Sequence, residues 1–164
     1  MSDEVKWGFE IARLVIPSLL VIVGWLVVFH QQKKNNFNQE FRKEIKAKLD
    51  EVHEDIRQLR QDCIDYYVTE TPRPDLPVVI RVLTDDIREK SVTLSQAIMD
   101  QNGLNGVYDT LSELVSSATG GAFETKKRQP VSMYDPKLNA VFNNGAKLAS
   151  TLDRAYQAKY HHQN

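Results

Sequence analysis

The apolar residues of the chain follow one pattern up to Phe29 and a different one beyond it. From Ile11 to Phe29 they are nearly continuous, and Arg13 is the only charged residue in the sequence IARLVIPSLLVIVGWLVVF. A helix of these 19 residues would be about 28 Å long, close to the thickness of the hydrocarbon core of a bilayer. Residues 14–29 also have no polar face, which a helix lying on a membrane surface would need. The pattern therefore predicts a transmembrane helix over residues 11–29.

A cleaved signal peptide and a buried core helix both fit this segment less well. A signal peptide has a basic start and a site of small residues after its apolar part, whereas this chain starts with Asp3 and Glu4 and has no such site after Phe29. A buried core helix would need cover on every side from a small remaining chain. Arg13 and Pro17 oppose insertion, but both lie in the first two turns, where Arg13 can reach the interface.

The charges on the two sides of the predicted span are unequal. Residues 1–13 contain the basic residues Lys6 and Arg13, whereas residues 30–48 contain Lys33, Lys34, Arg42, Lys43, Lys46 and Lys48. Because cytoplasmic flanks carry the excess of Lys and Arg, residues 1–10 are expected outside and the chain beyond the span in the cytoplasm. This plan fits a single-pass protein of the cell membrane, such as a bacterial inner membrane. The unpaired Cys63 agrees with a reducing compartment.

The basic residues between 33 and 48 are also candidates for a membrane-surface site. Lysine and arginine close to a span attract anionic lipid headgroups, at about 1 kcal/mol for each residue near the surface. The alternative is that this run serves only as the topology signal. In both cases the lipid bilayer is the first predicted partner.

A stripe of apolar residues begins within the basic flank, at alternating steps of four and three residues. It comprises Ile45, Leu49, Val52, Ile56, Leu59, Cys63 and Tyr66, which occupy the core positions of three heptads. No glycine or proline occurs between Trp25 and Thr71. One helix is therefore predicted to leave the membrane and to continue to about Val68.

This stripe, residues 45–66, can meet either of two partners. Short coiled coils are marginal alone and other helices of the chain are available, so one helix of an intramolecular bundle is the favoured expectation. The alternative is a parallel homo-oligomer, in which the stripe is the self-association surface and Asp55 of one copy pairs with Arg60 of another. In that arrangement Cys63 would face its twin and could be crosslinked.

The rest of the chain predicts further helices. Three prolines in residues 71–77 end the long helix. Beyond them apolar residues recur with helical periodicity, and glycine-rich breaks such as NGLNG at 102–106 separate helices at about 78–99, 106–119 and 136–160. The predicted fold is all-α, with a short outer N-terminus (1–10), the span (11–29), a juxtamembrane helix (30–70) and a cytoplasmic helical domain (71–164) that forms a bundle with the juxtamembrane helix.

Composition and charge exclude several classes of protein. The 164 residues allow one small domain and an appendage. The 21 basic and 22 acidic residues nearly cancel, which argues against a nucleic-acid-binding protein. A single cysteine excludes a disulfide-stabilised fold.

The sequence contains no motif of known chemistry. A nucleotide-binding glycine loop, a zinc-protease helix, a nucleophile elbow and a CxxC pair are all absent from it. Three weak candidates are His53 with Asp50 and Glu54, the acidic cluster of Asp85, Asp86 and Glu89, and the basic loop at 126–128. A solvated helix face or loop is the simpler interpretation of each. No catalytic residue, cofactor or metal site is therefore predicted.

Three functions follow from these observations, in order of preference. The first is a non-catalytic, membrane-anchored interaction module that holds an unidentified protein partner, or a second copy of itself through residues 45–66, at the membrane. The second is a membrane-perturbing effector of the holin or toxin kind, whose span oligomerises. The third and most remote is a metal-dependent enzyme at the membrane face, with Asp85, Asp86 and Glu89 as ligands.

Overall fold

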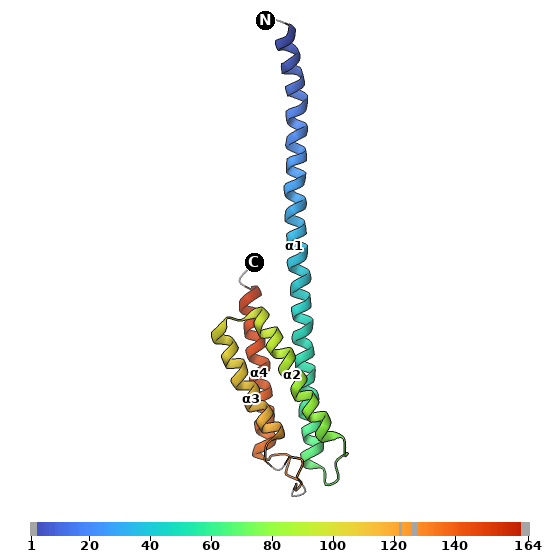
Figure 1. Ribbon diagram of the computed structural model, residues 1–164, viewed down its shortest axis with the longest axis vertical. Coiled ribbons are helices and arrows are strands. Elements are labelled where there is room, and N and C mark those ends of the chain that lie inside the picture. Colours follow the sequence, from blue (N-terminus) through green and yellow to red (C-terminus); the bar gives the residue numbers. More distant parts are fainter. Residues whose placement is uncertain (1–2, 122, 126–127, 162–164) are drawn as a thin grey trace. The chain divides into compact units, whose positions relative to one another are not determined.

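The chain forms four helices and, in the part that the structure covers, no strand. The computed structural model describes residues 3–121, 123–125 and 128–161, and within them it leaves out the side chains of residues 3–19, 35 and 161. The helices are α1 (Asp3–Val68), α2 (Leu76–Ile98), α3 (Gln101–Thr119) and α4 (Pro136–His161), as Figure 1 shows. The predicted all-α fold and helical bundle are confirmed.

The predicted transmembrane helix is not confirmed. Among the residues with described side chains, no helix holds an apolar stretch long enough to cross a membrane. The predicted span of residues 11–29 therefore finds no support there and stays a prediction. Its residues 11–19 lie outside the described side chains.

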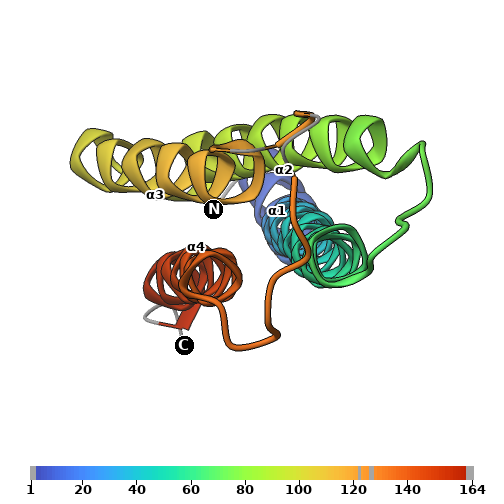
Figure 2. The same cartoon turned by 90° about the horizontal axis from the view of Figure 1, so that it is seen from below.

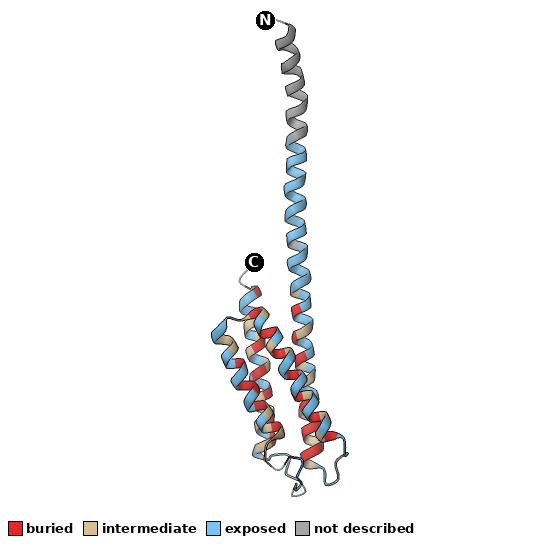
Figure 3. Cartoon of the chain, in the orientation of Figure 1, coloured by how far each residue is buried: buried red, intermediate tan, exposed pale blue. Residues whose placement is uncertain are grey.

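The chain divides into two units, and the division falls inside α1. The first unit comprises residues 1–43 and the second residues 44–164. In the described part of the first unit the side chains are exposed except for the half-buried Arg42, whereas Ile45 is the first fully buried one (Figure 3). Residues 44–68 share a core with the three following helices, because the heptad stripe supplies one wall of it. The functional boundaries expected at residues 30 and 71 stay predictions.

The second unit is an antiparallel four-helix bundle. Consecutive helices run in opposite directions (Figures 1 and 2), and the short connections from α1 to α2 and from α2 to α3 favour this arrangement. The core is built from the inward stripe of each helix, with Leu59, Leu94, Leu111 and Leu148 among its most buried residues. Polar contacts between helices lie beside this core. Lys90 of α2 binds Asp55 of α1 at 2.6 Å, and Arg60 of α1 donates to the carbonyl oxygen of Phe142 in α4 at 2.9 Å.

Helix α3 begins at Gln101 rather than at residue 106, so the predicted break at residues 102–106 is wrong. Asp100 is the N-cap, and its carboxylate accepts a hydrogen bond from the backbone N–H of Gly103 at 2.9 Å. A Cβ atom at Gly103 would lie 3.2 Å from the Cβ atom of Met99, so glycine relieves a close approach there. The two glycines of this segment therefore lie inside the first turns of the helix instead of ending the previous one.

Candidate functional site

An exposed apolar surface lies on α1 between Leu20 and Phe29. Every Leu, Ile, Val, Trp and Phe in this segment is more than half exposed, from 53% for Val23 to 75% for Trp25. Successive residues of a helix point in directions about 100° apart, so ten consecutive residues cover its whole circumference. Large apolar patches left exposed to water are rare and mark binding sites for another protein or for a membrane. We refer to residues 20–29 as the apolar segment.

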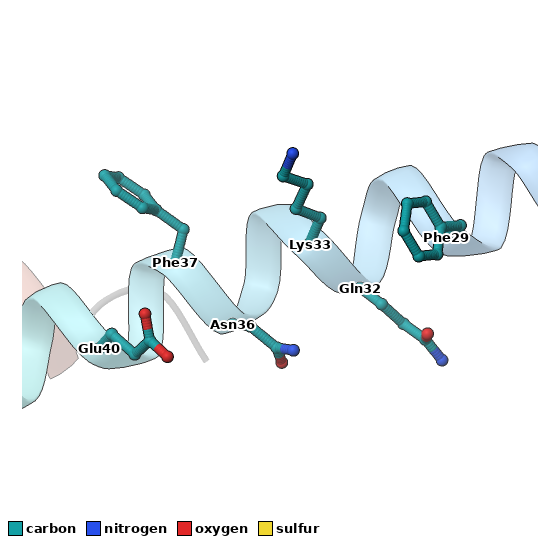
Figure 4. Close-up of a pocket in the computed structure, with 6 residues that line it drawn as sticks. All are labelled: Phe29, Gln32, Lys33, Asn36, Phe37 and Glu40. Atoms are coloured by element: carbon teal, nitrogen blue, oxygen red, sulfur yellow. The ribbon is translucent and has the colours of Figure 1, made fainter.

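A polar surface with an exposed phenylalanine follows the apolar segment. Figure 4 shows Lys33 and Phe37 on one side of α1 and Gln32, Asn36 and Glu40 on the other. Phe37 is 67% exposed, although a polar helix surface seldom carries a bare phenyl ring. Aromatic and cationic side chains in alternation are typical of a surface that meets the headgroup region of a bilayer.

The six basic residues predicted for a membrane surface have different surroundings. Lys46 and Lys48 form ion pairs along α1, with Asp50 and Glu44 respectively, each at 2.8 Å. The hydrogen bond from Lys46 to Asp50 raises the pKa of that lysine. Arg42 is half-buried, whereas Lys33, Lys34 and Lys43 are exposed. The charges best placed to meet an anionic surface are therefore those nearest the apolar segment, together with Lys43.

The heptad stripe is buried inside the bundle. All seven of its residues (Ile45, Leu49, Val52, Ile56, Leu59, Cys63 and Tyr66) are at most 4% exposed, and they belong to the core shared with α2, α3 and α4 of the same chain. The intramolecular alternative is thus the one that the structure shows, and the stripe offers no exposed self-association surface. The predicted pairing of Asp55 with Arg60 of another copy is also replaced, since Asp55 binds Lys90 and Arg60 binds the Phe142 carbonyl.

The buried stripe also determines the chemistry of Cys63. Its side chain is fully enclosed in the core and forms no disulfide. Burial, with a smaller contribution from the nearby Asp62 carboxylate, raises the pKa of the thiol to about 12. A neutral, enclosed thiol is a poor nucleophile and a poor crosslinking site, so the structure gives Cys63 a packing role.

A cluster of polar side chains fixes the C-terminal end of α1 to the chain around residues 118–137. The Tyr67 hydroxyl donates to the carbonyl oxygen of Ala118 at 2.6 Å, and the Tyr66 hydroxyl accepts from the backbone N–H of Glu124 at 3.0 Å. Lys137 lies over the Tyr67 ring, 4.1 Å from its centroid, and donates to the Gly120 carbonyl. Burial lowers the pKa of this lysine. These contacts hold the bundle together at its lower end in Figure 1.

Arg128 has a structural role that no sequence pattern indicates. Its guanidinium donates to three backbone carbonyl oxygens at the end of α1 and just beyond it: Tyr66 at 2.7 Å, Thr69 at 3.1 Å and Glu70 at 2.8 Å. The last carbonyls of a helix lack partners within the helix, and a cation there also complements the helix dipole. Within the basic loop at 126–128, Arg128 therefore serves as a cap, while Lys126 and Lys127 lie outside the described residues.

The weak metal candidates are not brought together. His53 lies 3.5 Å from Asp153, while Asp50 and Glu54 pair with Lys46 and Arg57. Asp85, Asp86 and Glu89 are exposed on α2. Over the part of the chain that the structure describes, no three His, Cys, Asp or Glu side chains gather as metal ligands would.

One buried carboxylate was not among the residues that the sequence singled out. Asp62 is 3% exposed; its Oδ1 atom accepts from Gln58 at 3.1 Å, and its Oδ2 atom has no hydrogen-bond partner among the described residues. Its position next to Cys63 in the heptad could have indicated that Asp62 is buried, because positions flanking a buried stripe are partly covered by neighbouring helices.

The chain matches no protein-family model, no curated protein and no solved structure.

Proposed function

We propose that the chain is a non-catalytic, membrane-anchored interaction module, whose N-terminus lies outside the cell membrane and whose helical bundle lies in the cytoplasm. The observation that carries this proposal is the exposure of the apolar segment, residues 20–29, around the whole helix. The sequence continues this segment upstream with five further aliphatic residues, namely Ile11, Leu14, Val15, Ile16 and Leu19.

Lipid is the environment that best suits such a segment. The stretch from Ile11 to Phe29 contains 13 Leu, Ile, Val and Phe residues. At about 0.3 to 0.6 kcal/mol each, they favour insertion by at most about 4 to 8 kcal/mol. Lys33 and Lys34, exposed just beyond the segment, support a cytoplasmic position for the chain that follows.

The bundle supplies the interaction surface of the proposed module. Along the outer side of α2, Val78 and Val82 are exposed one turn apart, and Asp85 and Glu89 continue the same face at steps of three and four residues. This face combines apolar contact area with negative charge. It would suit a cytoplasmic partner with a basic, partly apolar surface.

Alkaline extraction of membranes tests the anchor. The full chain is expressed in bacterial cells, and its membranes are washed at high pH, which releases peripheral proteins. We expect the wild type in the membrane pellet and a clearly larger share of Val23→Arg in the supernatant, because arginine well inside a span costs about 2.5 to 3.5 kcal/mol, a large part of the about 4 to 8 kcal/mol that favours insertion. The control is Val82→Arg, since Val82 is 55% exposed and Val23 53%, but Val82 lies on the bundle. Release of the wild type by alkali would refute the proposal.

Protease accessibility tests the orientation. In spheroplasts, protease added from outside is expected to leave a C-terminal tag intact until the membrane is permeabilised. Digestion of the tag in intact spheroplasts would contradict the cytoplasmic position of the bundle.

A further inference from the structure

A hollow lies on one face of the apolar segment, around Gly24. The hollow is lined by Val21, Gly24, Trp25, Val28, Phe29 and Gln32, which recur at helical spacing along α1. Glycine within a helix costs about 1 kcal/mol relative to alanine. A Cβ atom at Gly24 would meet nothing within 4 Å. The described part of the chain therefore contains no close contact that requires a glycine at this position.

A second membrane helix would provide such a contact. In lipid, apolar side chains gain little by leaving the tails, so helices associate where a small residue lets their backbones approach and where polar groups bond across the contact. On this face Val21 and Val28 stand on either side of Gly24, and the amide of Gln32 follows one turn beyond Val28. An amide can both donate and accept a hydrogen bond, so Gln32 can pair with its own symmetric equivalent.

From this geometry we infer that the face of Val21, Gly24, Trp25, Val28 and Gln32 binds the same face of a second copy of this chain within the membrane. The inference rests on the proposed function, because it needs α1 to be a span. Copies that obey the same charge rule insert in the same direction, so two of them are parallel. A twofold axis then brings Gly24 opposite Gly24 and Gln32 opposite Gln32 at equal depth.

Two features favour a second copy over a different protein. The face carries no charge, and the amide of Gln32 can bond to its own equivalent in a second copy, so the face needs no matching partner sequence. The heptad stripe, which was the other candidate for self-association, is enclosed within the chain's own bundle. The contact proposed here therefore leaves the bundle closed and its outer surface accessible to other proteins.

Energy transfer in vesicles tests this contact. Full chains carrying a donor or an acceptor fluorescent protein at the C-terminus are incorporated into phosphatidylcholine–phosphatidylglycerol vesicles, and transfer is followed as lipid is added. We expect wild-type transfer to persist at dilutions where Gly24→Ile gives none, because the isoleucine side chain fills the hollow. The matched control is Val23→Phe, which adds bulk to a different face, where Val23 is grouped with Leu26, Val27 and His30. This variant should behave as the wild type.

A second variant separates the hydrogen bond from the packing. Gln32→Leu should weaken association by about threefold to twentyfold, the range expected for one hydrogen bond between membrane helices. Alkaline extraction of each variant runs in parallel. A wild type that stays in the membrane pellet but shows no transfer beyond random encounter overturns this inference and leaves the membrane anchor standing. Equal transfer in wild type and Gly24→Ile also overturns it, whereas release of the wild type by alkali refutes the proposed function instead.

Discussion

Helix α1 contains two apolar regions that meet opposite surroundings. In residues 20–29 the apolar side chains cover all sides of the helix and are exposed, whereas in residues 45–66 they form one stripe and are buried. Leu20 is 67% exposed and Leu59 only 1%. A single stripe can be covered by helices packed on one side, as happens in the bundle. A fully apolar circumference needs cover from every direction, which three other helices cannot give while they also enclose their own core.

One kind of residue therefore has two effects in the same helix. Burial of leucine in the bundle stabilises the fold of this chain. Exposure of leucine in the apolar segment contributes nothing to the bundle and instead leaves an apolar surface uncovered, which we propose is covered by lipid or by a second copy. Similar changes in the two regions should thus alter the free energy of unfolding of the bundle unequally, and this is best measured on the full chain in mild detergent.

The largest contrast is expected between two leucines. Leu59→Ala removes a side chain from the core and leaves a cavity, so it should lower the free energy of unfolding by about 2 to 5 kcal/mol. Leu20→Ala should leave that free energy unchanged within error. Urea unfolding followed by far-UV circular dichroism measures both. Equal losses for the two variants would show that the apolar segment is part of the folding unit after all.

Two glycines provide the next contrast. A Cβ atom at Gly145 of α4 would lie 2.9 Å from the Cγ2 atom of Ile56 in the stripe, whereas a Cβ atom at Gly24 would meet nothing within 4 Å. Overpacking should therefore cost about 1 to 3 kcal/mol, which the higher helix propensity of alanine offsets by about 1 kcal/mol, so Gly145→Ala should lower the free energy of unfolding by up to about 2 kcal/mol. Gly24→Ala should leave the unfolding of the bundle unchanged. A Gly145→Ala variant that is more stable than the wild type would mean that α1 and α4 can separate at this point without penalty.

The buried thiol of Cys63 predicts a dependence of the stability of the bundle on pH. Burial raises the pKa of Cys63 from 9.0 to about 12, so the folded state holds its proton more tightly than the unfolded state. The stability due to the neutral thiol is complete below pH 9 and is lost as pH rises towards the folded value, by at most about 1.4 kcal/mol for each pH unit. Above pH 9, the urea midpoint of Cys63→Ala should therefore fall less steeply with rising pH than that of the wild type. Identical pH profiles would show that the thiol is already open to water.

The parts of the bundle differ in how far the sequence could predict them. A stripe at steps of three and four residues predicted the buried face of α1, and all its members lie in the core. The beginning of α3 could not be predicted in the same way, because Asn102 and Gly103 favour a turn in the sequence. The hydrogen bond by which Asp100 caps the helix forms only once these residues are helical. Arg128 could not be predicted at all. Its three carbonyl partners lie 58 to 62 residues earlier in the chain, so no local pattern records them.

The smallest contrast concerns exposed charges on the two sides of the division at residue 43. Lys46 pairs with Asp50 on the surface of α1, and its side chain remains 48% exposed. Solvent screens such a pair, so Lys46→Gln should lower the free energy of unfolding by about 0.5 kcal/mol or less, and added salt should reduce the difference further. Lys34→Gln, in the first unit, should have no effect on the bundle. Since the expected change is close to experimental error, the decisive measurement is its salt dependence. In about 1 M salt the screening length is only about 3 Å. A difference between Lys46→Gln and the wild type that persists there would mean that packing of the lysine stem, and not its charge, stabilises this end of the bundle.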